Sequence, residues 1–165
     1  MYLKNKFVHF FVFGSLYMNI EILARAAVKS LVGFNGIKPL SLMGYTSLWM
    51  FLVGGTCAVI VGKLNDYTKL HPLKTWEKIF IGGTIITLGE LLSGIILNII
   101  FDLHIWEYGG KFQFLGQIEL KNCLIWYFVM TPLIIWLDDI LSAYIYRHGK
   151  PYGITELYLK LILLK

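Results

Sequence analysis

Residues 79–101 have the sequence IFIGGTIITLGELLSGIILNIIF, and this stretch decides what kind of protein the chain is. It is bounded by Lys78 and Asp102 and carries one ionisable residue, Glu90. About 20 consecutive apolar residues are enough for an α-helix to cross the hydrocarbon core of a bilayer. Residues 79–101 exceed that length and are therefore predicted to form a membrane-spanning helix.

Three more long apolar stretches lie elsewhere in the chain, over residues 7–32, 43–62 and 122–146. Of the 165 residues, 57% are hydrophobic and 15% are charged. Soluble domains carry about 25% charged residues, so this composition excludes an ordinary soluble fold. We predict an all-α integral membrane helical bundle with four transmembrane helices. Pro132 is predicted to kink the fourth helix without breaking it, because neighbouring groups can satisfy the freed carbonyl.

The tail, residues 154–165, alternates Leu and Ile with charged residues and is too short to cross a bilayer. It is predicted to form an amphipathic helix that lies in the membrane interface. The whole chain, residues 1–165, is predicted to be a single membrane domain. The lipid bilayer is the predicted surrounding of the chain. Nucleic acid is not a predicted partner, because the Lys and Arg residues behind the net charge of +5 do not form a basic stripe.

A weak internal repeat links the first and third stretches. In each, a glycine precedes a glutamate by the same spacing, as Gly14 with Glu21 and as Gly83 with Glu90. The repeat would divide the chain into halves 7–63 and 76–146, a 2+2 duplication with parallel topology. A match this short also arises by chance, so both interpretations stay open.

The basic residues predict the orientation. Of the 15 Lys and Arg residues, ten fall at the two termini or between the second and third stretches, and the other five fall on the opposite side. Cytoplasmic segments of membrane proteins carry the excess of Lys and Arg. Both termini are therefore predicted to lie in the cytoplasm.

Glu90 is costly in its predicted position. It lies about 12 residues from Lys78 and from Asp102, close to the bilayer centre. A carboxylate there costs about 2.5–3.5 kcal/mol on insertion scales unless it is paired, hydrated or protonated. Two interpretations stay open: a neutral carboxyl that only bonds a neighbouring helix, and a group that binds a ligand, an ion or a proton.

The candidate ligand or proton site contains Glu21, Arg25 and Asn98 besides Glu90. Glu21 and Arg25 are four residues apart, so they can form an ion pair on one helix face. This pair would lower the free-energy cost of placing both charges in the membrane. Alternatively, Arg25 reaches Glu90 or an anionic group of a ligand. Asn98 shares a helical stripe with Glu90 and with small or polar residues, namely Gly83, Thr87 and Gly94. The second stretch has a similar stripe, formed by Ser47, Gly54, Ala58 and Gly62, and such stripes are typical of closely packed membrane helices.

No metal and no cofactor is predicted. Cys57 and Cys123 lie inside apolar stretches without CxxC spacing, and His104 has no second His or Cys near it in the sequence. Zinc sites and redox pairs depend on such spacing.

Four motifs resemble one protein family. They are Gly44-Tyr45-Thr46-Ser47-Leu48-Trp49-Met50-Phe51, Glu90-x3-Gly94, Trp106-Glu107-Tyr108 and Gly116-x-Ile118-x-Leu120-x5-Trp126. Over most of residues 14–139 the chain resembles the bacterial family of putative ABC-transporter type IV membrane proteins. The resemblance implies a small, transport-related, multi-pass protein of a bacterial plasma membrane. It also implies that the motif residues matter to the family: Gly44, Ser47, Trp49, Gly94, Trp106, Glu107, Tyr108, Gly116 and Trp126.

Three functions stay open. The leading one is a permease-like protein with a polar intramembrane site around Glu21, Arg25 and Glu90. The second is a membrane enzyme or lipid-handling protein that uses the aromatic loop 102–121, and the third is a non-catalytic helper subunit of a membrane complex. The sequence has no Walker A, HExxH or GxSxG motif, which disfavours an enzyme. ATP hydrolysis would need a separate ATPase subunit. Another membrane subunit and a second copy of the chain are the further candidate partners.

Overall fold

A computed structural model describes residues 2–32, 38, 40–68, 72–146 and 153–164. The chain is 75% helical, which confirms the predicted all-α class. Four segments are long and apolar enough to cross a membrane: Lys6–Ala27, Leu48–Tyr67, Thr75–Ile100 and Leu120–Ile145. The four predicted transmembrane helices are therefore confirmed.

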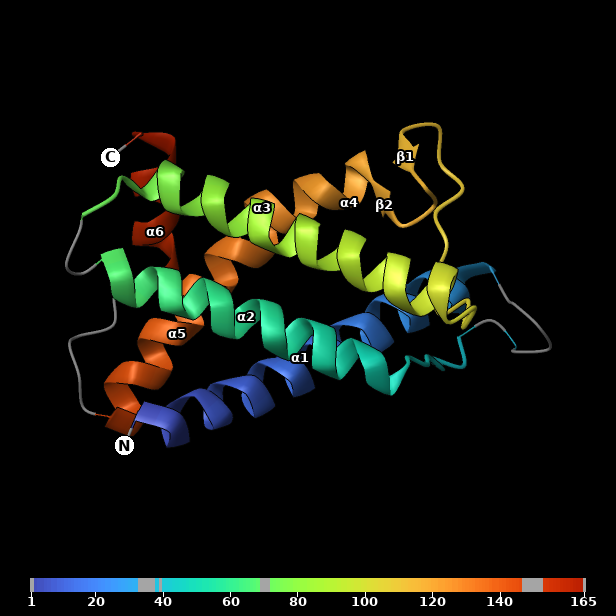
Figure 1. Cartoon of the computed structure of the whole chain (residues 1–165), viewed down its shortest axis with the longest axis horizontal. Coiled ribbons are helices and arrows are strands. Elements are labelled where there is room, and N and C mark those ends of the chain that lie inside the picture. Colours follow the sequence, from blue (N-terminus) through green and yellow to red (C-terminus); the bar gives the residue numbers. More distant parts are fainter. Residues whose placement is uncertain (1, 33–37, 39, 69–71, 147–152, 165) are drawn as a thin grey trace. The chain divides into compact units, whose positions relative to one another are not determined.

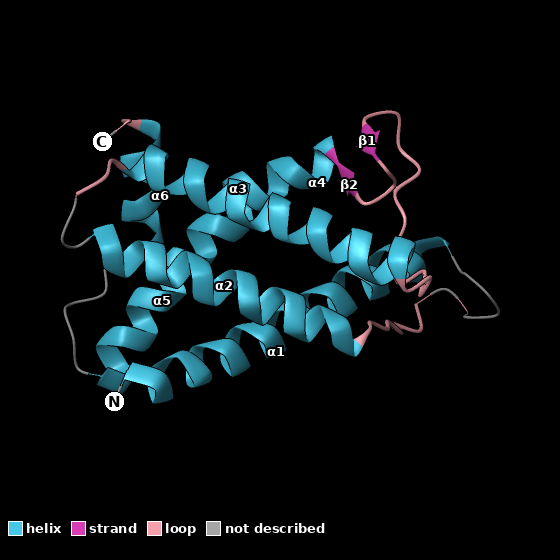
Figure 2. Cartoon of the chain, viewed as in Figure 1, coloured by secondary structure: helices cyan, strands magenta, loops and turns pink. Residues whose placement is uncertain are grey.

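The helices are drawn in Figures 1 and 2, and their order follows the four apolar stretches. The first two are α1 (Tyr2–Val32) and α2 (Leu48–Thr68), and α3 (Thr75–Gly94) continues into a π-helix, η1 (Ile95–Ile100). The fourth span consists of α4 (Leu120–Ile125), a second π-helix, η2 (Trp126–Met130), and α5 (Thr131–Tyr146). The tail forms α6 (Ile154–Ile162).

The chain divides into two compact units, residues 1–56 and 57–165, and the boundary falls inside α2. In the first unit, α1 packs closely on the start of α2. A Cβ atom at Gly14 would lie 2.7 Å from the carbonyl oxygen of Phe51, and one at Gly54 would lie 2.6 Å from the Tyr17 ring. These contacts are what the small-residue stripe predicted, because only glycine permits so close an approach.

In the second unit, α3 packs against η2 and α5, and α6 packs against α3 and α5. Its core holds aliphatic side chains from three helices, among them Val61, Ile79, Ile86 and Ile135. Leu157 of α6 is also buried, whereas Leu159 and Ile162 of the same helix are exposed. The tail helix thus has one face packed on the unit and apolar residues on its open surface.

The second helix differs from its predicted span, 43–62. It begins at Leu48, because residues 44–47 lie against α1 instead, and the Ser47 hydroxyl accepts a hydrogen bond from the backbone of Trp49. It continues to Thr68 through residues that were expected to form a polar loop. The reason is that Asn65 is buried and hydrogen-bonded inside the second unit, so its polar side chain is satisfied within a helix.

The fourth span changes direction between α4 and α5, as Figure 1 shows, and Pro132 is the second residue of α5. Proline has no N–H to donate, and the preceding turn is a π-helix in which Thr131 donates to the carbonyl of Trp126. The carbonyl of Phe128, four residues before Pro132, accepts a hydrogen bond of 3.0 Å from the Tyr158 hydroxyl of α6. A neighbouring helix therefore satisfies the carbonyl that Pro132 leaves free.

The loop that follows η1 contains a short antiparallel hairpin that the sequence did not predict. Its strands are β1 (Gln113–Phe114) and β2 (Ile118–Glu119), with Phe114 paired to Ile118. Gly116 at the turn has a φ of +68°, a conformation that glycine adopts without strain. The hairpin directs the chain back towards the fourth span.

Candidate functional site

Glu90 lies on α3, and its side chain is buried, with 6% of its surface exposed. Both carboxylate oxygens accept a hydrogen bond. The Tyr108 hydroxyl donates to Oε1 over 2.7 Å, and the indole N–H of Trp126 donates to Oε2 over 2.6 Å. Both donors are electrically neutral, so they solvate the carboxylate without cancelling its charge.

Helical periodicity explains why Glu90 points inward. Gly83, Glu90, Gly94 and Asn98 are all buried, so the stripe predicted from their spacing faces the interior of the second unit. The isoleucines and leucines between them include exposed residues such as Leu88, Leu92 and Ile96. An exposed aliphatic surface is what a lipid-facing helix side requires.

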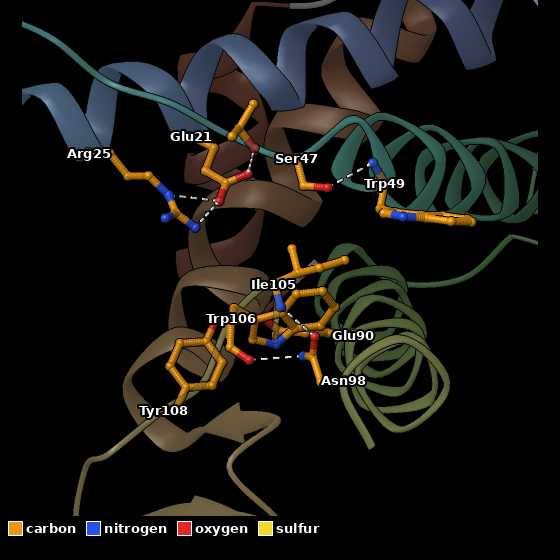
Figure 3. Close-up of polar contacts among 10 residues, drawn as sticks. Glu21, Arg25, Ser47, Trp49, Glu90, Asn98, Ile105, Trp106 and Tyr108 are labelled. Atoms are coloured by element: carbon orange, nitrogen blue, oxygen red, sulfur yellow. Dashed lines mark hydrogen bonds and ion pairs between the residues drawn. The ribbon is translucent and has the colours of Figure 1, made fainter. Parts of the chain in front are cut away.

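Asn98 holds the loop that carries Tyr108. Its amide nitrogen donates to the carbonyl of Trp106 over 2.9 Å, and its Oδ1 accepts from the backbone N–H of Ile105 over 2.8 Å (Figure 3). The same amide nitrogen also donates to Oε1 of Gln117 over 2.7 Å. These three bonds occupy both amide protons and the carbonyl oxygen. The loop therefore folds back along η1, and Tyr108 reaches Glu90, which lies two turns before Asn98.

Gln117 is a site residue that sequence reasoning missed. It is buried, its side chain bonds Asn98, and its carbonyl accepts from the Trp106 indole over 3.1 Å. A Cβ atom at Gly94 would lie 2.6 Å from its Oε1, so Gly94 makes room for the amide. The only hint in the sequence is that Gln117 follows Gly116, a residue type common in turns. Because the hairpin was not predicted, this turn was not recognised.

Glu21 and Arg25 form a cluster within the first unit. Arg25 donates from Nε over 3.0 Å and from Nη2 over 2.5 Å to Oε1 of Glu21, and the Thr46 hydroxyl donates to Oε2 (Figure 3). The Arg25 guanidinium also lies 5.3 Å from the centre of the Tyr45 ring. The i,i+4 ion pair that the spacing predicted is confirmed, and the loop before α2 adds two partners.

The motif around Gly44 anchors this loop on α1. A Cβ atom at Gly44 would collide with the carbonyl of Ile22, so only glycine fits there. Tyr45 contacts Arg25 and Thr46 contacts Glu21. Ser47 immediately precedes α2, and its hydroxyl accepts from the backbone N–H of Trp49. Trp49 is partly exposed and its backbone N–H is the donor to Ser47.

A third polar cluster was not predicted as a site. The amide of Asn65 donates to Asp138 over 3.1 Å and to Asp139 over 2.9 Å, and Asp138 is 1% exposed. Gly62 packs directly on Asp138. In the sequence the two aspartates interrupt the apolar stretch 122–146, and no spacing or motif indicates their partner on α2.

The motif residues lie in two places: Gly44, Ser47 and Trp49 lie in the first unit, and the others lie in the second. Trp106, Tyr108, Gly94 and Trp126 surround the Glu90–Asn98 stripe, and the Gly116 carbonyl accepts the backbone N–H of Tyr108 over 2.8 Å. Glu107 is exposed. Within the described residues, no group of three or more His, Cys, Asp or Glu side chains is placed to hold a metal ion.

Four apolar spans, with polar side chains buried inside each unit, define a multi-pass integral membrane protein. The family model described as "Putative ABC-transporter type IV" matches residues 7–164, and the chain belongs to this family. No solved structure matches the chain. The family and the four spans identify a transport-related membrane protein, and the resemblance noted from the motifs is confirmed.

Proposed function

We propose that the protein is a small permease-like carrier in which Glu90 is the intramembrane group that binds and releases a proton or a ligand. The observation that carries this proposal is the pair of neutral donors on a buried carboxylate. Within the described part of the chain, Glu90 makes no ion pair. Neutral donors do not cancel the negative charge of a carboxylate. The charge can therefore still be neutralised by a proton that binds reversibly.

A purely structural role accounts less well for this arrangement. Packing in the second unit already uses glycines at the helix contacts. The neutral amide of a glutamine could bond the same two groups, accepting from Trp126 and donating to the Tyr108 oxygen. Retaining a carboxyl in a membrane interior carries a cost that an amide avoids. The acidic group is therefore proposed to serve exchange of a proton or a cationic group.

The Glu21–Arg25 pair is proposed to contribute a second polar group to transport. Its charges neutralise each other, and Arg25 keeps N–H groups beyond the two that bond Glu21. Arg25 is therefore proposed to contact an anionic part of a solute. For Asn98, whose polar atoms are engaged by the loop, ligand binding stays a prediction.

The setting proposed for this function is the plasma membrane of a bacterium, with both termini in the cytoplasm. The excess of Lys and Arg at the termini and between the second and third spans supports that orientation. A separate ATPase, another membrane subunit or a second copy of the chain is the proposed partner class. Co-purification of a nucleotide-binding subunit with the full chain would support the first of these.

The test is solute uptake by proteoliposomes. Wild-type protein, Glu90→Gln and Glu156→Gln would be given a defined mixture of amino acids, nucleosides, sugars and organic acids under an imposed proton gradient. Wild type should accumulate at least one solute, and Glu90→Gln should lose that accumulation. Glu156→Gln is the matched control, because it makes the same chemical change on an exposed pair with Lys160. Equal contents in wild-type and empty liposomes would contradict the carrier proposal and favour the helper subunit.

A further inference from the structure

Tyr108 joins the buried carboxyl to the loop side of the protein. Its hydroxyl bonds Glu90, whereas its backbone belongs to the loop and lies between the exposed residues Glu107 and Gly109. The ring itself is half-buried. Among the two donors to Glu90, Tyr108 comes from this loop, and Trp126 comes from the interior of the fourth span.

We propose that Tyr108 is a proton relay between Glu90 and the water on the side of the Asp102–Lys121 loop. This inference rests on the proposed function of Glu90. Under the predicted orientation, that side is the outside of the cell. Glu90 would then load and unload its proton from the outer face through a single side chain.

The two donors differ in what they can do with a proton. A phenol hydroxyl both donates and accepts, whereas an indole N–H only donates. When Glu90 is ionised, both can donate to it. When Glu90 is protonated, its own O–H must find an acceptor, and the Tyr108 oxygen is the one that can turn to accept. The geometry therefore accommodates both states of Glu90, with the proton on Oε1.

The transfer balances in one step. The Tyr108 hydroxyl proton passes to Oε1 of Glu90, and a proton from a hydronium ion in the loop-side water binds the Tyr108 oxygen. The O–H bond of tyrosine breaks and a new one forms, so tyrosine is neutral before and after. Glu90 gains one proton and the water loses one. The reverse sequence returns the proton.

The loop holds Tyr108 in place for this transfer. Its backbone N–H donates to the carbonyl of Gly116 over 2.8 Å, and the segment before it is fixed by the three bonds of Asn98. A hydroxyl held at 2.7 Å from the carboxylate is within proton-transfer distance. Tyr108 therefore needs no rearrangement before it donates.

Among the described residues of the second unit, two thiols are close enough to be affected by the charge of Glu90. Cys57 of α2 and Cys123 of α4 both lie within electrostatic reach of its carboxylate. Cys57 is buried, so it offers no route to water by itself. Cys123 is half-buried and is the competing relay that an experiment must exclude.

The experiment follows the protonation of Glu90 by time-resolved infrared spectroscopy of full-length protein in liposomes. The band of the protonated carboxyl is assigned by its absence in Glu90→Gln. After a rapid change in the pH of the external buffer, Tyr108→Phe should slow the change of this band by at least about tenfold. Tyr127→Phe, which makes the same chemical change on a hydroxyl that bonds Thr84 over 2.8 Å, should keep the wild-type rate. Cys123→Ala should also keep it.

Failure of the relay and failure of the proposed function give different results. If the carboxyl band of wild type does not respond to pH, the proposed function of Glu90 is wrong. If the band responds but Tyr108→Phe follows wild type, or slows no more than Tyr127→Phe, the relay is wrong. A fluorinated tyrosine at position 108 preserves shape and changes acidity, so it tests the relay even if Tyr108→Phe folds poorly. An exchange rate unaltered by the fluorinated residue would overturn the proposal.

Discussion

Glu90 shows how a single residue can be both tolerated and useful inside a membrane. Its two oxygens each receive one hydrogen bond, so the desolvation cost is offset without a buried cation. A glutamine at this position reproduces the pattern of the protonated acid. Its carbonyl accepts from Trp126 and its amide donates to the Tyr108 oxygen.

We therefore expect Glu90→Gln to fold as wild type does and Glu90→Lys to fail. A lysine ammonium only donates hydrogen bonds, so the Trp126 N–H would lose its acceptor. The ammonium would also be a buried, unpaired charge, at a cost of about 2.5–3.5 kcal/mol or more. Membrane yield and the melting temperature in detergent measure this. Equal yields of the two variants would mean that residue 90 faces water or lipid headgroups.

Asn98 is expected to stabilise the loop that carries Tyr108. Asn98→Ala leaves the Ile105 N–H, the Trp106 carbonyl and Gln117 without their shared partner, which should cost about 1–3 kcal/mol for each buried group left unsatisfied. Thermal unfolding and protease cleavage within residues 102–121 would report it. Asn19→Ala is the control, since Asn19 is exposed and makes one local bond to Ser15. A similar loss in both variants would contradict the role of Asn98.

At the scale of elements, the spans were predictable because the bilayer fixes their length and polarity. The third span was predicted from Ile79, and it begins at Thr75, where the Lys74 backbone N–H donates to the Glu77 carboxylate over 2.7 Å. The predicted stripe of Glu90 and Asn98 was confirmed, because helical period depends on spacing alone. The partners of that stripe could not be predicted, since Tyr108 and Gln117 reach it through a hairpin whose fold-back depends on tertiary contacts.

The tail helix is expected to stabilise the fourth span through one hydrogen bond. Tyr158→Phe removes the donor to the Phe128 carbonyl and should cost about 0.5–1.5 kcal/mol. In a Pro132→Ala background, the substituted alanine supplies an N–H within the helix, so the same Tyr158→Phe change should cost less. A double-mutant cycle on the melting temperature measures the difference. Strictly additive costs would mean that Tyr158 does not act through the carbonyl freed by Pro132.

At the scale of the whole molecule, four spans require both termini to lie on one side of the membrane. The distribution of Lys and Arg predicts that this side is the cytoplasm. The loop that carries Tyr108 then faces outward, so the proposed relay would connect Glu90 to the water outside the cell. Topology and relay are thus linked by the same loop.

Cysteine labelling tests the topology. In a Cys57→Ala, Cys123→Ala background, Gly109→Cys should react with an impermeant maleimide added to intact cells, because a side chain at Gly109 meets open space. Glu156→Cys, on the exposed side of α6, should react after the membrane is permeabilised. Labelling of position 156 in intact cells would contradict this orientation and place the termini outside the cell.

The most direct test of Glu90 as the exchanging group is the pH dependence of solute exchange without a proton gradient. Liposomes loaded with the transported solute would exchange it against labelled external solute at a series of pH values. Glu90→Gln, fixed in a form that resembles the protonated acid, should still exchange solute, with a rate that does not vary with pH. Wild type should show a clear variation over the same range. A Glu90→Gln protein whose exchange follows the wild-type pH profile would contradict the role assigned to Glu90.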